Sequence, residues 1–430
     1  MSSFAVISNP KKANLDSLEL PSSKSISNRL LIIQYLSNSD LNIENLSTSD
    51  DTILLKQNLN KVKQRISNTD FSNEFIELQC KNAGTTCRFL ISLLSITYGK
   101  WIINADERMQ NRPIIPLIES LKSLGADIET ASLDKVFPLR IKGKRLTSSK
   151  DITLPSNLSS QFISSMAMIA PFIDNGLQIN LSPRQVSIPY INMTASLMRE
   201  NGADVRLEKD KLIIKKGNYT FKSTKVESDW SAAAFAYSIV ALGEIKTLKI
   251  KDLYQDSTQG DSIVADLFSN FFNVSTEFDT EGVSLRFDKS LSTENKIVKI
   301  DFTSYPDLFL PLIATAVCLK KSFEFSGLET LTYKESDRLK NIIYEIKKIG
   351  IELSYENDKI SFHKDNYPKN LSSINIDADS YNDHRIAMAL SLFAFRCNSV
   401  RIKNPECVNK SFPDYWKVLS DYFKVEFSEI

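Results

Sequence analysis

Cysteine and histidine are scarce in this sequence. The five cysteines include no C-x-x-C pair, and the two histidines are His363 and His384. This supply is too small for a disulfide framework, a zinc site or a multi-histidine metal centre. We therefore expect neither a metal nor another cofactor.

Long apolar runs and an excess of one charge are also missing. No segment reaches the roughly 18 unbroken apolar residues of a membrane helix, and the opening residues MSSFAVISNPKK lack a signal peptide's long apolar region. The net charge of +1 creates no general field for nucleic acid or an anionic membrane. We expect a cytoplasmic protein that binds small molecules. Because no dimerisation stripe is evident, a monomer is the default expectation.

A repeated phrase marks the chain: a run of helical pattern, then a glycine, then a strand. It occurs around Gly125, Gly202 and Gly350, and a degraded copy has Asn273 in place of the glycine. The spacings of 77 and 148 residues correspond to one and two lengths of a unit of about 72 residues, which fits six times into 430 residues. Each glycine is predicted to end its helix in the left-handed conformation.

Short alternating strands such as VSLRF and SVRIKN accompany the helical runs, so the predicted fold class is mixed α/β. The weakest join lies near residue 228, where a polar stretch leads into an apolar helix. Another lies at residues 20–22, because the opening strand can belong to the C-terminal half. We expect an N-terminal domain at residues 21–228 and a discontinuous C-terminal domain at residues 1–20 plus 229–430.

Clusters of anion-binding residues precede several apolar helical runs. The segment LPSSKSISNRLLIIQYL brings a lysine and an arginine to a helix start, and NAGTTCR, KESDR and NDHR repeat the pattern. A helix N-terminus offers free N–H groups and a positive dipole end, to which arginine adds a bidentate fork. Several such starts together predict that helix ends converge on a multiply anionic ligand.

Each cluster alone has a simpler structural interpretation. Ser25 and Asp383 are acceptable helix N-caps whatever the function. Lys334 and Glu335 could form a solvated surface pair, and Gly84 could serve a turn. Only the combination of clusters favours a binding site.

Together these motifs resemble those of the EPSP (5-enolpyruvylshikimate-3-phosphate) synthase family. The matching segments, in the family's order over nearly the whole chain, are LPSSKSISNR, NAGT, ERMQNRPI, SSQF, SIPYI, YPD, KESDR, YNDHR and KSFPDY. The resemblance implies two domains of three repeated α/β units each, with ligands in a cleft between them that a hinge closes. It also implies transfer of the enolpyruvyl (carboxyvinyl) group of phosphoenolpyruvate to the 5-hydroxyl of shikimate 3-phosphate, releasing phosphate, in the shikimate pathway to aromatic amino acids.

The resemblance also assigns ligand contacts position by position. Gly84 suits its assignment physically, because a side chain there would intrude on a small ligand. The contacts implied for shikimate 3-phosphate are Lys24, Ser25, Arg29, Ser159, Ser160, Gln161, Ser187, Tyr190, Asp307, Thr330 and Lys334. Those implied for phosphoenolpyruvate are Lys24, Asn82, Gly84, Arg112, Gln161, Arg338, Arg385 and Lys410.

Two carboxylates in a basic pocket could share the proton transfers that this reaction needs. The resemblance makes Asp307 the acceptor of the hydroxyl proton and Glu335 the donor to C3 of phosphoenolpyruvate. Lys334 would hold the substrate or relay protons, His384 would orient Glu335 or a water, and Lys24 would contact both substrates. Without the resemblance, Asp307 is better interpreted as the N-cap of the apolar helix that follows it.

Three positions depart from the family's usual pattern. Ser22 stands where glycine is common, a change that we expect to be tolerated. Thr330 replaces an asparagine that contacts the shikimate phosphate in many members, and Thr332 replaces a common basic or polar residue. A hydrogen bond from the Thr330 hydroxyl could still serve the phosphate.

Two other functions compete with this interpretation. A sister enzyme transfers enolpyruvyl to UDP-N-acetylglucosamine on the same architecture, but it would carry a reactive cysteine near DERMQNRP, where this chain has none. A non-catalytic phosphosugar-binding protein could keep Lys24 and Arg29 and dispense with Asp307 and Glu335. Both carboxylates are present, which favours an enzyme.

Overall fold

The computed structural model describes residues 3–11, 16–67, 74–132, 135–147, 151–154, 159–181, 186–291, 293 and 296–429. Contacts between Cα atoms divide the chain into two compact units. Unit 1 comprises Met1–Ser22 and Glu227–Ile430, and unit 2 comprises Ser23–Val226. The divisions expected from the sequence lay between residues 20 and 21 and between residues 228 and 229.

The strands of the described residues form small sheets that repeat one topology. Five four-stranded sheets each contain a parallel pair, followed by two strands that add on antiparallel. A sixth sheet is the parallel pair of β12 (Thr224–Lys225) and β3 (Ile43–Glu44). This recurrence confirms the mixed α/β class and the repeated unit that the glycine spacing predicted.

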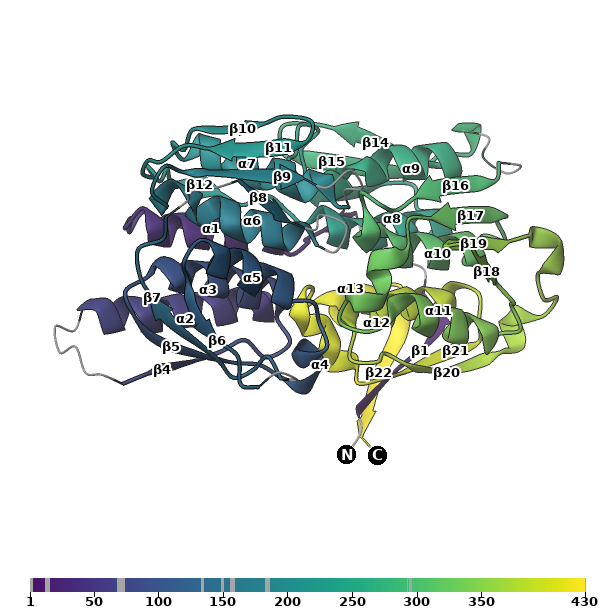
Figure 1. Cartoon of the computed structure of the whole chain (residues 1–430). Coiled ribbons are helices and arrows are strands. Elements are labelled where there is room, and N and C mark those ends of the chain that lie inside the picture. Colours follow the sequence, from purple (N-terminus) through teal and green to yellow (C-terminus); the bar gives the residue numbers. More distant parts are fainter. Residues whose placement is uncertain are drawn as a thin grey trace. The chain divides into compact units, whose positions relative to one another are not determined.

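Unit 1 holds three of these sheets (Figure 1). In sheet order and starting from the parallel pair, the first sheet has β2 (Ser17–Leu18), β13 (Leu248–Lys251), β15 (Gly282–Phe287) and β14 (Val274–Phe278). The second has β16 (Val298–Asp301), β17 (Phe323–Ser326), β19 (Lys359–Phe362) and β18 (Ser354–Glu356). The third has β20 (Asn375–Asp379), β21 (Ser399–Lys403), β1 (Ser3–Pro10) and β22 (Phe423–Glu429).

Unit 2 holds the other three sheets. Its strands, again in sheet order, are β4 (Ile76–Gln79), β5 (Gly99–Asn104), β7 (Leu139–Gly143) and β6 (Asp127–Glu129); β8 (Ile152–Leu154), β9 (Leu177–Leu181), β11 (Lys211–Ile214) and β10 (Val205–Leu207); and β12 (Thr224–Lys225) with β3 (Ile43–Glu44).

The opening strand belongs to the C-terminal half of the chain, as the sequence predicted. β1 lies between β21 and β22 and pairs antiparallel with both. The two termini therefore lie side by side in Figure 1, where the purple β1 runs along the yellow β22. β2 likewise pairs with β13, so both N-terminal strands complete sheets of unit 1.

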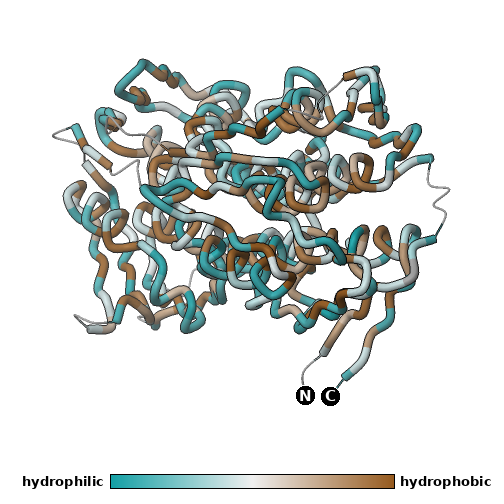
Figure 2. The backbone as a smooth tube through the Cα atoms, turned by 90° about the vertical axis from the view of Figure 1, so that its right-hand side faces the viewer, coloured by the Kyte–Doolittle hydropathy of each residue, from teal (hydrophilic) through white to brown (hydrophobic). Residues whose placement is uncertain are grey.

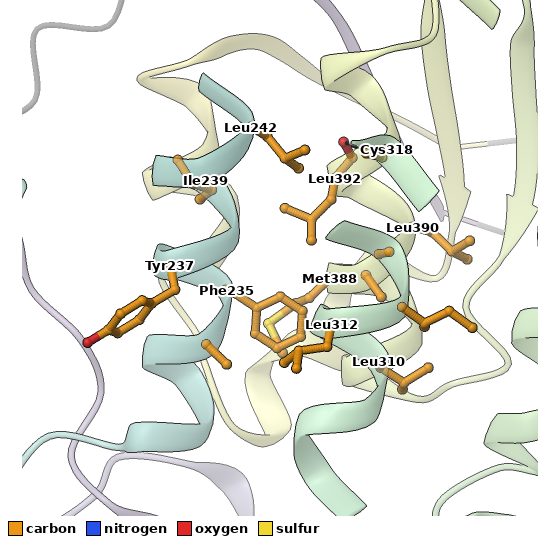
Figure 3. Packing of buried hydrophobic residues seen from close by; sticks show 14 of the residues in the cluster. Phe235, Tyr237, Ile239, Leu242, Leu310, Leu312, Cys318, Met388, Leu390 and Leu392 are labelled. Atoms are coloured by element: carbon orange, nitrogen blue, oxygen red, sulfur yellow. Dashed lines mark hydrogen bonds between the residues drawn. The ribbon is translucent and has the colours of Figure 1, made fainter. Parts of the chain in front are cut away.

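One helix of each repeat is buried on almost all sides and forms the core of its unit. In α8 (Trp230–Gly243) every residue from Trp230 to Leu242 is buried, because alanine and large apolar residues leave no polar face. Figure 3 shows Phe235 of this helix beside Leu312 of α10 (Phe309–Cys318) and Met388 of α12 (His384–Ser391), and Leu242 beside Leu392 of η8 (Leu392–Phe395). In Figure 2 the outer loops are mostly teal, whereas brown stretches gather along the inner helices.

The helices of unit 2 are α1 (Lys24–Leu36), α2 (Asp50–Ser67), α3 (Gly84–Ile96), α4 (Glu107–Gln110), α5 (Ile115–Ser123), α6 (Ser160–Ile169), η1 (Ala170–Phe172) and α7 (Ile188–Glu200). Those of unit 1 are α8 (Trp230–Gly243), η2 (Gly260–Ile263), α9 (Val264–Phe271), η3 (Lys289–Leu291), η4 (Pro306–Leu308), α10 (Phe309–Cys318), η5 (Glu329–Tyr333), α11 (Arg338–Lys347), η6 (Lys364–Asn366), η7 (Leu371–Ser373), α12 (His384–Ser391), η8 (Leu392–Phe395), η9 (Pro405–Lys410) and α13 (Tyr415–Ser420). Among the described residues, no helix combines the length and apolar character needed to cross a bilayer.

The glycines of the repeated phrase lie where the sequence predicted. Gly125, Gly202 and Gly350 follow α5, α7 and α11 with φ of 93°, 90° and 77°. Asn273, in the degraded copy, follows α9 with φ of 58°. Glycine and asparagine adopt this left-handed region more readily than other residues, which explains why only these two types occupy the position.

Candidate active site

The first candidate cluster of unit 2 lies at the start of α1. Ser23 caps the helix, with its hydroxyl accepting from the Ile26 N–H at 3.4 Å. Lys24 is the first helical residue, and its Nζ lies 3.4 Å from Oδ2 of Asp51 at the start of α2. One serine therefore satisfies the cap, and Lys24 is left facing a carboxylate rather than bulk solvent.

Arg29, one turn further along α1, is buried with a 2% exposed surface. Its Nε donates to Thr194 Oγ1 at 2.7 Å, and its terminal nitrogens donate to the Ser25 carbonyl at 2.8 Å and Ser164 Oγ at 3.2 Å. Burial lowers the pKa of Arg29 to about 10, and the nearby Tyr190 opposes that shift. A buried guanidinium held by hydroxyl and carbonyl oxygens is well suited to bind an anion.

The second cluster of unit 2 lies at the start of α3. Gly84 is the first residue of that helix, and a Cβ there would lie 2.5 Å from a terminal nitrogen of Arg112. The other terminal nitrogen of Arg112 donates to the Asn82 carbonyl at 3.2 Å. The absence of a side chain at Gly84 therefore lets the Arg112 guanidinium lie directly against the helix N-terminus.

Gln161 joins the starts of α3 and α6. Its Oε1 accepts from Arg88 at 2.7 Å, and its Nε2 donates to Thr85 Oγ1 at 3.0 Å. Ser159 caps α6 by accepting from the Gln161 N–H at 3.2 Å, and Ser160 begins the helix. The sequence noted Arg88 only as part of a motif, and the structure adds it as the group that orients Gln161.

Of the predicted pair at the start of α7, Ser187 and Tyr190, the second lies beside Arg29. Ser187 caps this helix in the left-handed conformation, with φ of 56°, and is 8% exposed. The carbonyl of Tyr190 accepts from Arg29 at 3.4 Å and from Thr194 at 2.8 Å. The α1 and α7 starts thus share one hydrogen-bonded cluster.

In unit 1, Asp307 is surrounded by cations. It lies in η4, directly before the buried helix α10, and its side chain is 19% exposed. Its Oδ1 lies 2.9 Å from Arg338 and 3.4 Å from Lys334, and its Oδ2 lies 3.5 Å from Arg385. The structure thus brings together four residues that the sequence placed in three separate motifs.

These cations set the ionisation of Asp307. Burial by itself would raise the pKa of this carboxyl, but the charges of Arg385, Lys334 and Arg338 outweigh burial and hold the pKa well below its ordinary value. For Lys334 burial has the larger effect: it lowers the pKa of the amine, although the charge of Asp307 acts in the opposite direction. The Asp307 carboxyl is therefore ionised at neutral pH.

Arg338, the first residue of α11, joins three carboxylates. Besides Asp307, it contacts Glu335 at 2.7 Å and Asp383 at 2.9 Å. The side chain of Asp383 has no exposed surface, and that of Arg338 is 2% exposed. Asp383 also accepts from Ser336 Oγ at 3.1 Å, so the KESDR and NDHR motifs are bonded to each other.

The remaining predicted residues of unit 1 lie around this network. Lys410, at the end of η9, has its Nζ 3.8 Å from Oε1 of Glu335. His384 is 1% exposed, and its Nδ1 lies 3.8 Å from Asp383 Oδ1. The backbone of Asp307 accepts from Arg385 at 3.3 Å. Thr330 lies half-buried in η5, and its contact to a phosphate stays a prediction.

Sequence reasoning missed two carboxylates that the structure places in these clusters. Asp51 pairs with Lys24, and its carbonyl accepts from Thr86 in α3 at 2.8 Å. Asp261, in η2, is 2% exposed and is hydrogen-bonded by the Ser231 hydroxyl at the start of α8. A helix-starting acidic pair, Asp50–Asp51, was the available signal for the first; the QGDS segment around Asp261 gives no comparable signal.

Asp261 is expected to make stability fall with rising pH. Burial, and then the nearby Asp307 and Asp229, raise its pKa from 3.8 to about 7, against the Ser231 hydrogen bond and Arg385. Between these two pH values the folded state binds the proton that the unfolded state releases, so the free energy of unfolding declines as pH rises.

Asp261→Asn removes this titration. Its melting temperature should therefore exceed that of the wild type by at least about 2 °C at pH 8.5, for about 1 kcal/mol, and by less at pH 5. Asp266→Asn, on the exposed surface of neighbouring α9, is the control and should show no such pH-dependent gain. A difference in melting temperature between Asp261→Asn and the wild type that stays constant from pH 5 to pH 8.5 would contradict the expectation.

The fold and these clusters define a class of protein: a repeated α/β protein that binds small, multiply charged anions and carries carboxylates able to move protons beside them. Among the described residues, no group of three or more histidine, cysteine, aspartate or glutamate side chains is arranged to hold a metal ion.

Comparison with known proteins supplies the family. Residues 10–419 match the family EPSP synthase (3-phosphoshikimate 1-carboxyvinyltransferase). A 3-phosphoshikimate 1-carboxyvinyltransferase of Bacteroides fragilis (strain YCH46) is 39% identical over 404 residues, which cover 94% of each chain. The enzyme of that name from Buchnera aphidicola subsp. Cinara cedri is 34% identical over 423 residues, covering 93% of each chain. This chain belongs to the EPSP synthase family.

The fold agrees with that assignment. A solved EPSP synthase from Acinetobacter baumannii superposes with a TM-score of 0.76 and 21% sequence identity, and the match covers 100% of both chains.

Proposed function

We propose that this chain transfers the carboxyvinyl group of phosphoenolpyruvate to the 5-hydroxyl of shikimate 3-phosphate, giving 5-enolpyruvylshikimate 3-phosphate and phosphate. The observation that carries the proposal is the cluster in unit 1, where Asp307 and Glu335 lie within ion-pair distance of Arg338. This combination supplies both the anion-binding charge and the proton-transfer groups that the reaction needs.

The two clusters of unit 2 and the cluster of unit 1 divide the ligand contacts. For shikimate 3-phosphate, the buried Arg29 and the hydroxyls and N-termini around it support a phosphate and hydroxyl site. For phosphoenolpyruvate, Arg112 against Gly84 supports one anionic group, and Arg338 with Arg385 supports another. We further propose that both units act on the same pair of substrates.

In the proposed chemistry, Asp307 takes the proton of the 5-hydroxyl as its oxygen forms a bond to C2 of phosphoenolpyruvate. Glu335 delivers a proton to C3, which gives a tetrahedral intermediate with a methyl group. Loss of a C3 proton and cleavage of the C2–O bond to phosphate then yield the product. Glu335 takes that C3 proton, and Asp307 gives its proton to the departing phosphate, so each carboxyl group regains its starting state.

Substrate binding would also tune the base. Two of the cations that depress the pKa of Asp307, Arg385 and Arg338, are also proposed to bind phosphoenolpyruvate. An anion that pairs with Arg385 and Arg338 offsets their field at Asp307 and raises its pKa. Asp307 would then be a stronger base in the complex than in the free protein.

A phosphate-release assay tests this function. Release should require both phosphoenolpyruvate and shikimate 3-phosphate and should continue in the presence of a chelator. UDP-N-acetylglucosamine in place of shikimate 3-phosphate should give no release. The proposal would be overturned if phosphate were released with UDP-N-acetylglucosamine but not with shikimate 3-phosphate as the acceptor. It would also be overturned if neither acceptor supported release.

Gly84→Ala is expected to weaken phosphoenolpyruvate binding selectively. The added Cβ would lie 2.5 Å and 2.6 Å from terminal nitrogens of Arg112 and Arg88, which can swing away because they end flexible side chains. The fold should therefore persist while the Arg112 guanidinium moves, and we expect the KM for phosphoenolpyruvate to rise about tenfold, the effect of roughly 1.4 kcal/mol.

Steady-state kinetics on each substrate check this expectation. Gly217→Ala is a matched control, since a Cβ at that glycine would meet open space. The KM for shikimate 3-phosphate should change little in Gly217→Ala, and in Gly84→Ala it should rise less than the KM for phosphoenolpyruvate, since Arg88 orients Gln161. A Gly84→Ala enzyme with the wild-type KM for phosphoenolpyruvate would refute the assigned role of this glycine.

We also propose that the enzyme works as a monomer in the cytoplasm. All five cysteines are free, and four of them are buried, as suits a reducing compartment. The near-neutral net charge of +1 supports small-molecule partners over nucleic acid or an anionic membrane.

A further inference from the structure

The loop that carries the NDHR motif has an unusual backbone. Between β20 and α12, two consecutive residues, Tyr381 and Asn382, have φ of 52° and 53°. Asparagine tolerates this left-handed region, but a bulky residue such as tyrosine rarely adopts it. Interactions elsewhere must therefore hold Tyr381 in this conformation.

Part of the support comes from the ends of the neighbouring strands. The Tyr381 N–H donates to Asp379 Oδ1 at 2.6 Å, and the Asp383 N–H donates to the Ser380 carbonyl at 2.9 Å. Asn404, after β21, donates from Nδ2 to Asn382 Oδ1 at 3.0 Å. These bonds fix the loop to its own sheet and leave the facing helix, α11, to be positioned separately.

One of the bonds from the loop to α11 is made by the Tyr381 hydroxyl. It donates to Glu345 Oε1 at 2.8 Å. The Glu345 side chain has no exposed surface, and Lys348 pairs with it at 2.8 Å. Lys348 also donates to the Asp377 carbonyl in β20 at 3.1 Å, so the acid is compensated and the group is tied to the sheet.

The position of Glu345 along the helix gives this contact its importance. It lies seven residues, or about two helical turns, after Arg338, so both side chains project from the same face of α11. Arg338 bonds to Asp383 at 2.9 Å, and Glu345 accepts from Tyr381 two residues earlier in the loop. Two separate contacts therefore fix both the rotation and the axial position of α11 against the start of α12.

We propose that Tyr381 and Glu345 form a positioning pair, which holds α11 against the start of α12 so that Arg338 and Arg385 present their guanidinium groups to phosphoenolpyruvate in one fixed arrangement. The inference rests on the proposed function. Neither residue contacts the reacting atoms, and both act through the two arginines. Burial, and then the bond to Glu345, raise the pKa of Tyr381, so its hydroxyl keeps the proton that it donates throughout the working pH range.

Tyr381→Phe removes one hydrogen bond and keeps the ring. We expect kcat/KM for phosphoenolpyruvate to fall about fivefold, the range expected for one net hydrogen bond, mainly through a higher KM. Affinity for shikimate 3-phosphate alone, measured by calorimetry, should stay within about twofold. Glu345→Leu should reproduce this fall in kcat/KM. Glu345→Gln keeps an acceptor oxygen and should therefore retain most of the wild-type kcat/KM.

The double variant Tyr381→Phe/Glu345→Leu should be no worse than the poorer single variant, because both remove the same bond. Tyr344→Phe, at the 58% exposed neighbour on the same helix, is the matched control and should behave as wild type. A lower kcat with an unchanged KM for phosphoenolpyruvate would indicate a loss of folded enzyme and overturn the inference, as would wild-type kinetics. A wild-type protein without turnover would instead overturn the proposed function, and this inference with it.

Discussion

Asp307→Asn should lower kcat by about 10²- to 10⁴-fold, the usual contribution of a positioned acid or base. The asparagine keeps the shape of the side chain, but it cannot accept the hydroxyl proton, and it leaves Arg338, Lys334 and Arg385 without their shared carboxylate. Phosphate release under saturating substrates measures the effect, with circular dichroism confirming the fold.

The control for this variant is Asp301→Asn. Asp301 ends β16, only six residues earlier, and its Oδ1 accepts from the Thr303 N–H at 2.8 Å, which an asparagine oxygen can also do. Its activity should remain near that of the wild type. Turnover by Asp307→Asn at the rate of this control would remove the proposed role of Asp307 as the base.

The predictions that succeeded rest on local backbone rules. The glycine at the end of each repeated helix, and Asn273 in the degraded copy, could be placed because a position with left-handed backbone conformation strongly favours glycine or asparagine. The motif residues Lys24 and Ser160 each begin a helix for a similar reason, since a capping serine directly precedes an apolar run. Gly84 also begins a helix, although the residue at its N-cap position, Ala83, provides no side-chain cap.

The pairings within each site could not be predicted in this way. Arg338 and Asp383 are 45 residues apart, and Arg29 and Thr194 are 165 residues apart, so no periodicity connects them. The left-handed Tyr381 gives no sequence signal at all, because its conformation comes from tertiary contacts that override the preference of the residue. The resemblance to a family identified the motifs, and the bonds among them required the structure.

Arg338→Met should cost about 3–5 kcal/mol of stability, the usual result of leaving a buried charge without its partner. The change leaves Asp383, with no exposed surface, facing an apolar side chain, and it also removes the 2.7 Å contact to Glu335. Burial by itself would lower the pKa of Arg338, but the surrounding carboxylates, Asp383 first, raise it above its ordinary value, so the arginine is charged at every working pH. Urea denaturation of both proteins measures the difference.

Exposed ion pairs provide the contrast that makes this expectation specific to burial. Arg401 pairs with Asp377 at 2.6 Å on side chains that are 40% and 65% exposed, so Arg401→Met should cost no more than about 1 kcal/mol. Adding Asp383→Asn to Arg338→Met should recover part of the loss, because the orphaned group is then a neutral amide that can still accept from the Arg385 N–H. If Arg338→Met and Arg401→Met are equally stable, the carboxylates around Arg338 do not depend on its charge, and the central ion network of unit 1 is held by packing alone.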